Sequence, residues 1–424
     1  MPTKKENEGC GCGCASIPFS VVLLFLGLGI WGFRQLDNWK ITERLPESVS
    51  QYIPQQLQPK TPTEISNGQS PVIPDVTAAL PSPAAPPSPS PVAPDSPPST
   101  GSGQASPSPS PSPSSSQQSS NSTSQSPQTP WEQKQIRGIY LSRYQVTNNA
   151  SEQMIRDRVR YYKAQGMNTI IHGVWGNGCT MYPSDVMKQT FGQESCPNQF
   201  QDQWLDWLID EAHQQGMQVH AYFEKGIKLD ENSPIFDTAV ENRWIVPGVD
   251  KTYPDVDHYL LDVEIPEVET FFKQALAEFV QKYPEIDAVQ WDDYLGYHDE
   301  LPGKVNRTEQ LTAFVKQLKA DMKAANPNVS FDLCHHNPYW GKRYFAADWD
   351  NWGVDRAFIQ IYNDDNFDEE IAYAEQYEGV AITEKQLHRV DALVSNPKIK
   401  SILVFPAAGN PEEAAKLVKE TVGH

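Results

Sequence analysis

The sequence predicts a (β/α)8 TIM barrel, and three observations support this fold class. Short apolar runs rich in β-branched and aromatic residues alternate with amphipathic helical segments, which indicates parallel strands joined by right-handed crossovers. Eight such runs follow Trp131, enough to close a barrel. No glycine-rich phosphate loop follows the first run, which disfavours a doubly wound open sheet. The expected strands span residues 137–142, 167–175, 217–224, 288–291, 329–335, 357–362, 379–383 and 401–405.

Glycine and proline mark the ends of the helices between these runs. The first helix starts at Ser151 and ends at Gly166, and the helix from Trp204 to Gln215 ends at Gly216. Glycine is typical just past a helix end because it enters the left-handed conformation freely. This repeated strand and helix punctuation supports the βα alternation.

The first 130 residues have a different composition from the rest. We expect an N-terminal tail with a Cys/Gly run at 1–16, a transmembrane helix at 17–33, a disordered Pro/Ser/Thr-rich linker at 34–130 and the barrel at 131–424. Residues 17–33 carry no charge and are near the lower length limit of a membrane span. A cleavable signal peptide is the alternative, but no small-x-small cleavage pattern follows. The linker has too few large apolar residues to form a core.

The formal net charge of −20 disfavours nucleic acid as a partner, because phosphate binding requires a basic surface. Basic residues flank the expected membrane span on both sides, so the positive-inside rule barely decides its orientation. The Pro/Ser-rich linker and the carbohydrate-type barrel argued below favour a single-pass membrane protein with an extracytoplasmic catalytic domain.

The cysteines fall into groups with different expectations. The Gly-Cys run at 10–14 matches no zinc spacing. Cys179 and Cys196 flank a loop after the second expected strand and could form a disulfide outside the cytoplasm. Cys334 lies in an expected strand as a small buried residue. We expect neither a resident metal nor a cofactor.

Three acidic residues stand at the ends of expected strands, where α/β barrels build their active sites. Asp292 and Asp293 end the fourth strand, and Glu224 ends the third. Because side chains alternate along a strand, Glu224 and Asp292 should both point into the barrel mouth. The alternatives are that the aspartates only begin a turn and that Glu224 is a solvated acid paired with a nearby lysine.

Two facing carboxyl groups are the minimal apparatus for cleaving a glycosidic bond. One must be protonated to assist the leaving oxygen, and the other must be ionised to attack the anomeric carbon or to activate water. We therefore expect Asp292, Glu224 and Asp293 to be catalytic, without assigning acid and base. Aromatic and polar residues that follow the strands are candidates for sugar binding. They are Arg143, Trp175, Asn177, Tyr294, His335, Asn337, Gln360, Tyr362 and Glu384.

Several motifs in this order resemble the bacterial family-10-like glycosyl hydrolase domain. The resemblance covers most of residues 135–410 and implies a (β/α)8 barrel that hydrolyses carbohydrate, with the double aspartate as the best catalytic candidate. The chain departs from its relatives where they carry Ser-Pro-Asn after the fifth strand, so that only Asn337 matches there. The main motifs are Arg137-Gly-Ile-Tyr-Leu, Tyr182-Pro-Ser, Val219-His-Ala-Tyr-Phe-Glu224 and Gln290-Trp-Asp-Asp-Tyr294.

The sequence thus predicts a membrane-tethered, extracytoplasmic glycoside hydrolase that acts on a polysaccharide, with cell-wall glycan as the nearest large polymer. One alternative is a metal-dependent carbohydrate deacetylase or esterase, with Asp292, Asp293, His335 and His336 as ligands. Another is a non-catalytic glycan-binding barrel that keeps the aromatic residues. The sugar and the linkage are not specified by the sequence.

Overall fold

The computed structural model describes residues 128–251, 256–298, 301 and 306–423. The expected tail at 1–16, the expected transmembrane helix at 17–33 and nearly all of the expected linker lie outside these residues. No helix in the described part of the chain combines the length and the apolar character needed to span a membrane.

Eight parallel strands form a closed barrel, which confirms the predicted fold class. Strand β1 pairs with both β2 and β11, so the sheet has no open edge between its first and last barrel strands. The barrel strands are β1 Ile136–Leu141, β2 Thr169–Gly176, β4 Gln218–Phe223, β7 Ala288–Trp291, β8 Ser330–His335, β9 Arg356–Ile361, β10 Gly379–Thr383 and β11 Ser401–Phe405.

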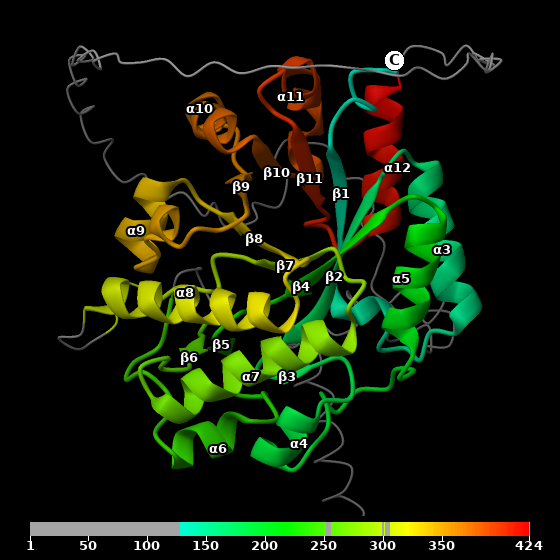
Figure 1. Cartoon of the computed structure of the whole chain (residues 1–424). Helices are drawn as coiled ribbons and strands as arrows, with labels where there is room; N and C mark the ends of the chain where they lie inside the picture. The colour runs from blue at the N-terminus through cyan, green and yellow to red at the C-terminus, as the bar shows by residue number, and fades with distance from the viewer. Residues whose placement is uncertain (1–127, 252–255, 299–300, 302–305, 424) are drawn as a thin grey trace, which may run out of the picture. The chain divides into compact units, whose positions relative to one another are not determined.

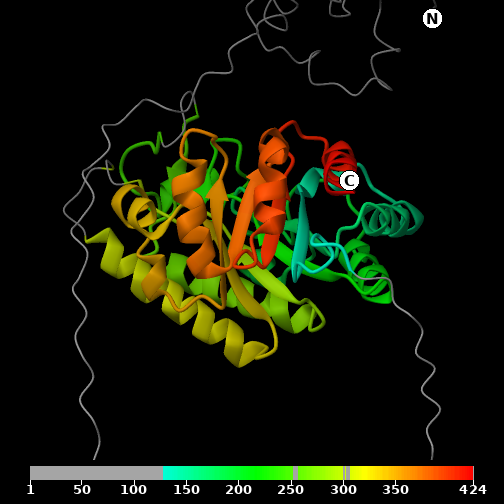
Figure 2. The ribbon, with the colours of Figure 1, turned by 90° about the horizontal axis from the view of Figure 1, so that it is seen from above.

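The helices surround the strands, as Figures 1 and 2 show. The Ser151 side chain caps the first of them, and Gly166 and Gly216 follow two helices with the left-handed φ values of +86° and +64° that favour glycine. They are α3 Glu152–Ala164, α5 Trp204–Gln214, α7 Pro266–Lys282, α8 Arg307–Ala325, α9 Pro338–Phe345, α10 Phe367–Tyr377, α11 Val390–Ser395 and α12 Pro411–Val422.

Two long loops after β2 and β4 contain short elements that the sequence did not predict. Together they occupy the lower part of the view in Figure 1. The two-residue strands β5 and β6 pair with each other in a separate small sheet. The elements are β3 Cys179–Thr180, α4 Asp185–Phe191, β5 Lys228–Leu229, α6 Phe236–Glu241 and β6 Tyr259–Leu260.

Side chains that point into the barrel and those that face the helices form two separate clusters. The inner cluster includes Tyr140, Ile171, Tyr222, Phe358 and Leu403. The outer cluster contains the intervening apolar positions of the same strands, which pack against the helices. Because aromatic and aliphatic side chains fill the barrel interior, the open end of the barrel is the place left for a ligand.

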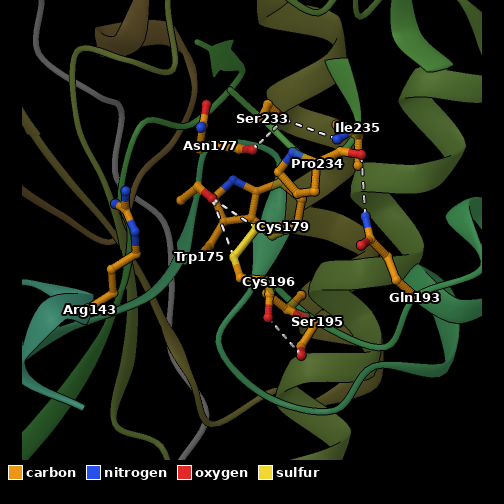
Figure 3. Close-up of a disulfide and its surroundings, with 12 residues drawn as sticks. Arg143, Trp175, Asn177, Cys179, Gln193, Ser195, Cys196, Ser233, Pro234 and Ile235 are labelled. Carbon is orange, nitrogen blue, oxygen red and sulfur yellow. Dashed lines mark hydrogen bonds between the residues drawn. A yellow bond between two sulfur atoms is a disulfide. The ribbon is translucent and has the colours of Figure 1, made fainter. Parts of the chain in front are cut away.

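The predicted disulfide between Cys179 and Cys196 is present, with a Cα–Cα distance of 5.2 Å. It closes the loop that contains α4, and it lies beside the segment Ser233–Ile235 from the loop after β4 (Figure 3). Ser233 donates a hydrogen bond to the backbone carbonyl of Asn177 at 2.8 Å, which joins the two loops. The bridge therefore fixes one of the two large loops on the barrel.

Removing this disulfide should lower the free energy of unfolding by about 3 kcal/mol, because a loop of this length then regains its entropy in the unfolded chain. Equilibrium urea unfolding of the Cys179→Ser/Cys196→Ser protein, compared with the wild type under oxidising conditions, measures the difference. Adding a reductant should shift the wild-type midpoint but not that of the double variant. An unchanged wild-type midpoint would contradict the stabilising role.

Candidate active site

The three predicted acidic residues lie at the carboxyl ends of two neighbouring strands. Glu224 follows β4, and Asp292 and Asp293 follow β7, which pairs with β4 in parallel register. Trp291 and Val289 pack in the outer cluster, so Asp292 takes the inner side, as the alternation predicts. The acids therefore meet at the mouth of the barrel.

Asp292 is held in a buried, hydrogen-bonded position. Its Oδ2 accepts a hydrogen bond from the Tyr222 hydroxyl, and its Oδ1 accepts one from the backbone N–H of Tyr294 at 3.0 Å. Burial, and after it the charges of Asp293 and Glu224, raises the pKa of the Asp292 carboxyl well above its ordinary value, although the two hydrogen bonds oppose the shift. The surroundings of Asp292 therefore disfavour its charged form.

Glu224 stands in a different electrostatic setting. Its Oε1 forms an ion pair with Nη1 of Arg143 at 3.0 Å, and its side chain is 20% exposed. Arg143 belongs to a short 3-10 helix, Arg143–Gln145, that follows β1. A buried guanidinium thus lies within ion-pair distance of this carboxyl group.

Two glycines in β2 leave the space for this ion pair. A Cβ on Gly173 would lie 2.9 Å from Oε2 of Glu224 and 2.7 Å from the backbone nitrogen of Arg143. A Cβ on Gly176 would lie 2.6 Å from Nη1 of Arg143. The close approach of Arg143 and Glu224 to β2 therefore requires the absence of side chains there.

Asp293 extends the polar group toward the next strands. Its Oδ1 accepts a hydrogen bond from the Gln360 amide at 3.4 Å, and His336 Nε2 lies 4.0 Å from its Oδ2. Gln360 also donates to the backbone carbonyl of Cys334 at 3.2 Å. The carboxyl groups and their partners thus form an arc across the ends of β4, β7, β8 and β9.

A pocket of about 280 Å³ opens beside Glu224. Aromatic rings form much of its wall, and Glu224 is its acidic lining residue. Oε2 of Glu224 is buried and has no hydrogen-bond partner among the described residues. An apolar pocket with a few polar groups is typical of a small-molecule site. Its lining includes Tyr140, Tyr144, Gln145, Tyr222, Glu224, Phe405 and Pro406.

Some predicted binding residues lie elsewhere. Trp175 is fully buried in the outer cluster against Phe223 and Phe272, so the expectation that it lines the mouth is wrong. The strand register shifts between Gly173 and Trp175, and this irregularity turns the ring outward. Asn177 bridges two loops, since its amide donates to Asn232 and its Oδ1 accepts from the backbone of Asp230.

Two predicted binding residues at the end of β8 and just after it contact other parts of the fold and not the acids. His335 is buried with its ring beside Phe345 at a centroid distance of 5.3 Å, whereas its neighbour His336 is the histidine near Asp293. Asn337 caps α9 and donates to Glu370 at 2.7 Å. In the part of the chain that the structure describes, no group of three or more His, Cys, Asp or Glu residues is arranged to hold a metal ion. The four-residue metal set of the alternative hypothesis is thus not assembled.

The remaining candidates border the site. Tyr294 lies beside Asp292 through its backbone, and the Lys228 ammonium stands over its ring at 4.9 Å. Tyr362 approaches Cys334 Sγ to 4.0 Å at the edge of the inner cluster.

Glu384 accepts hydrogen bonds from the backbone N–H groups of Ala407 and Ala408, both at 2.7 Å. Glu384 therefore fixes the loop that forms one wall of the pocket.

The sequence analysis did not include Tyr222 among the site residues, and it considered His336 only as a metal ligand. The alternation places Tyr222 on the same strand face as Glu224, and this signal could have identified it as a partner of the acids. The aromatic wall formed by Tyr140 and Phe405 comes from strands distant in sequence, and its assembly depends on closure of the barrel.

Residues 135–311 match the family model described as "Glycosyl hydrolase-like 10", and the predicted resemblance is confirmed over that range. The curated protein "Glycosyl hydrolase DigH" of Escherichia coli K12 is 29% identical over 240 residues, which cover 47% of this chain and 51% of that protein. The protein of the same name from Shigella flexneri matches equally. The chain spans about half the length of these curated relatives.

Solved glycoside hydrolase structures are similar at 10–12% identity. A GH20 exo-β-N-acetylglucosaminidase from Vibrio harveyi has a TM-score of 0.46 over 68% of this chain and 54% of its own. An endo-β-1,4-mannanase from Thermotoga petrophila scores 0.43 over 69% and 77%. The GH36 α-galactosidase AgaA from Geobacillus stearothermophilus scores 0.43 over 69% and 43%. What the described residues show is a closed (β/α)8 barrel, part of which matches the family model.

Replacing Asp292 with Asn should stabilise the fold as the pH rises. A carboxyl whose folded-state pKa is raised costs no stability below its unfolded pKa of about 3.9, and its cost grows as pH rises toward the folded pKa. The amide oxygen can still accept from the Tyr294 backbone N–H, and the amide nitrogen can donate to the Tyr222 oxygen, so both contacts can persist, the second with its direction reversed, while this cost is removed. The midpoint difference between Asp292→Asn and wild type in thermal unfolding should thus be small at pH 3.5 and favour the variant at pH 7. A variant that is less stable at pH 7 than at pH 3.5, relative to wild type, would contradict the buried, protonated carboxyl.

Proposed function

We propose that this domain hydrolyses glycosidic bonds, with Asp292 as the general acid and Glu224 as the ionised partner. The observation that carries the proposal is the contrast between the two carboxyl groups at one mouth. One is buried, with its pKa raised by desolvation and by the charge of Asp293, and the other is paired with Arg143. Glycoside hydrolysis requires this division into a protonated and an ionised carboxyl.

In the proposed reaction, Asp292 gives its proton to the glycosidic oxygen as the bond to the anomeric carbon breaks. Tyr222 and the Tyr294 backbone hold the carboxyl in place and stabilise the carboxylate that this transfer leaves. As this bond breaks, Glu224 either attacks the anomeric carbon or removes a proton from the water that attacks it. In the first case a glycosyl ester forms on Glu224, and a water molecule that gives its proton to the Asp292 carboxylate then cleaves this ester. The separation of the two carboxyl groups in a complex would distinguish these routes, since about 5 Å fits retention and about 6.5–9.5 Å fits inversion.

Asp293 supports the proton donor without contacting the bond that breaks. The negative charge of Asp293 disfavours ionisation of Asp292. The amide of Gln360, on β9, donates a hydrogen bond to Asp293 and holds it in place. We infer that the sugar ring on the Glu224 side occupies the pocket lined by Tyr140, Tyr222 and Phe405.

For the whole chain we propose an extracytoplasmic, membrane-tethered enzyme that acts on a polysaccharide, with cell-wall glycan as the first substrate to test. The uncharged segment at 17–33 and the Pro/Ser-rich segment after it support the tether and its reach. The Cys179–Cys196 disulfide supports an oxidising compartment.

The test compares two variants on substrates that differ in their leaving group. Asp292→Asn should lower kcat about 100-fold or more on a glycan, but much less on a dinitrophenyl glycoside of the same sugar, because that leaving group departs without a proton. Glu224→Gln should lose activity on both substrates, since each needs the ionised carboxyl.

An exposed carboxylate that is neither a lining residue of the pocket nor a contact of the acids provides the matched control, and Asp202→Asn should retain wild-type kinetics on both substrates. Wild-type activity of Asp292→Asn on the glycan would overturn the assignment of the acid. Binding of glycan by the wild type with no turnover of any substrate would favour the glycan-binding alternative.

A further inference from the structure

A partly exposed aromatic strip leads from the end of β8 onto α9, next to the arc of carboxyl groups. We use the name α9 shelf for His336, Trp340 and Tyr344. The Trp340 ring is 6.3 Å from the His336 ring and 4.7 Å from the Tyr344 ring, measured between centroids. Trp340 is 39% exposed, although a tryptophan on a helix usually buries most of its surface. Clustered exposed apolar side chains are typical of binding surfaces.

The α9 shelf is continuous with the acids. Nε2 of His336 lies 4.0 Å from Oδ2 of Asp293, so a molecule that contacts the arc can extend directly over His336 to Trp340. Tyr339, which precedes Trp340 on the helix, is 51% exposed and adds further aromatic surface to α9.

The α9 shelf is rigidly supported from below. Asn337 accepts a hydrogen bond from the backbone N–H of Trp340 at 3.0 Å and is itself fixed by Glu370. The His336 ring stacks on Phe345 at 5.2 Å, and the indole N–H of Trp349 donates to the His336 carbonyl at 3.0 Å. These supports fix α9, so Trp340 is exposed on an ordered surface.

The position of the α9 shelf relative to the pocket follows from the barrel topology. The pocket is lined by residues of β1 and β11, and β8, which leads into α9, is the fourth strand from β1 in either direction around the barrel. The acids on β4 and β7 lie between the two. A chain of sugars that enters the pocket and passes the acids therefore continues toward α9.

We propose that the α9 shelf binds sugar rings of the same glycan chain beyond the bond that is cleaved, with Trp340 stacking on the apolar face of a pyranose. This rests on the proposed function for the location of the cleaved bond. It specifies the substrate class as a polymer or long oligosaccharide whose sugar rings contact the protein on both sides of the cleaved bond. Aromatic faces suit this role because the C–H groups of a sugar ring pack on them, while its hydroxyl groups stay in water.

Binding of the inactive full-length Asp292→Asn protein to insoluble peptidoglycan, chitin and cellulose by cosedimentation tests this inference. Adding Trp340→Ala should weaken the affinity about 3- to 10-fold on each glycan that retains the parent. Trp340→Phe should recover part of the loss, because a smaller ring still stacks. Met154→Ala, which removes an exposed apolar side chain on α3, should leave the affinity unchanged.

Two outcomes would overturn the inference, namely equal affinity of the Trp340→Ala protein and its parent, or retention of the parent by none of the three glycans. Hydrolysis by the wild type is measured on the same glycans and tests the proposed function separately. If the wild type hydrolyses a glycan and Trp340→Ala does not weaken binding to it, only the α9 shelf is wrong. If Trp340→Ala weakens binding but the wild type hydrolyses nothing, the α9 shelf stands and the catalytic proposal fails.

Discussion

Closure of the parallel sheet is the constraint on which the site depends. Strand β1 hydrogen-bonds to β2 on one side and β11 on the other, so the inner positions of all eight strands converge on one axis. A shift of one residue in β7 would turn Asp292 toward the helices and place the Trp291 ring in the interior. The location of the acid is therefore set by the backbone pairing, before any contact between the acid and its neighbours is considered.

The two carboxyl groups illustrate how neighbouring groups on one scaffold acquire different surroundings. Burial at the end of β7 and the charge of the neighbouring acid raise the pKa of Asp292. The hydrogen bonds from Tyr222 and from the Tyr294 backbone lower it but do not cancel the rise. Glu224 is two residues beyond Tyr222, but the loop after β1 brings the guanidinium of Arg143 to it. The difference between the surroundings of the two acids thus depends on Arg143, a residue more than eighty positions before Glu224 in the chain.

Much of the fold was accessible from the sequence because it follows from local periodicity. All eight barrel strands, the helix ends at Gly166 and Gly216, and the inward direction of Asp292 follow from alternation and punctuation. The Trp175 assignment failed because the irregularity after Gly173 changes the alternation, and nothing in the sequence marks it. Glu384 illustrates a different limit, since its partners at Ala407 and Ala408 come from a loop whose position exists only in the closed barrel.

Gly173 and Gly176 make the site sensitive to substitution at positions that carry no functional group. Neither residue has a side chain that could bind or react, but an added methyl group at either position would occupy space taken by Arg143 or Glu224. In a scan of all substitutions, Gly173 should tolerate less change than Gly176, because its added methyl group would meet the backbone of Arg143 and not only a flexible side chain. The absence of side chains at these two positions thus shapes the candidate site as much as the groups that line it.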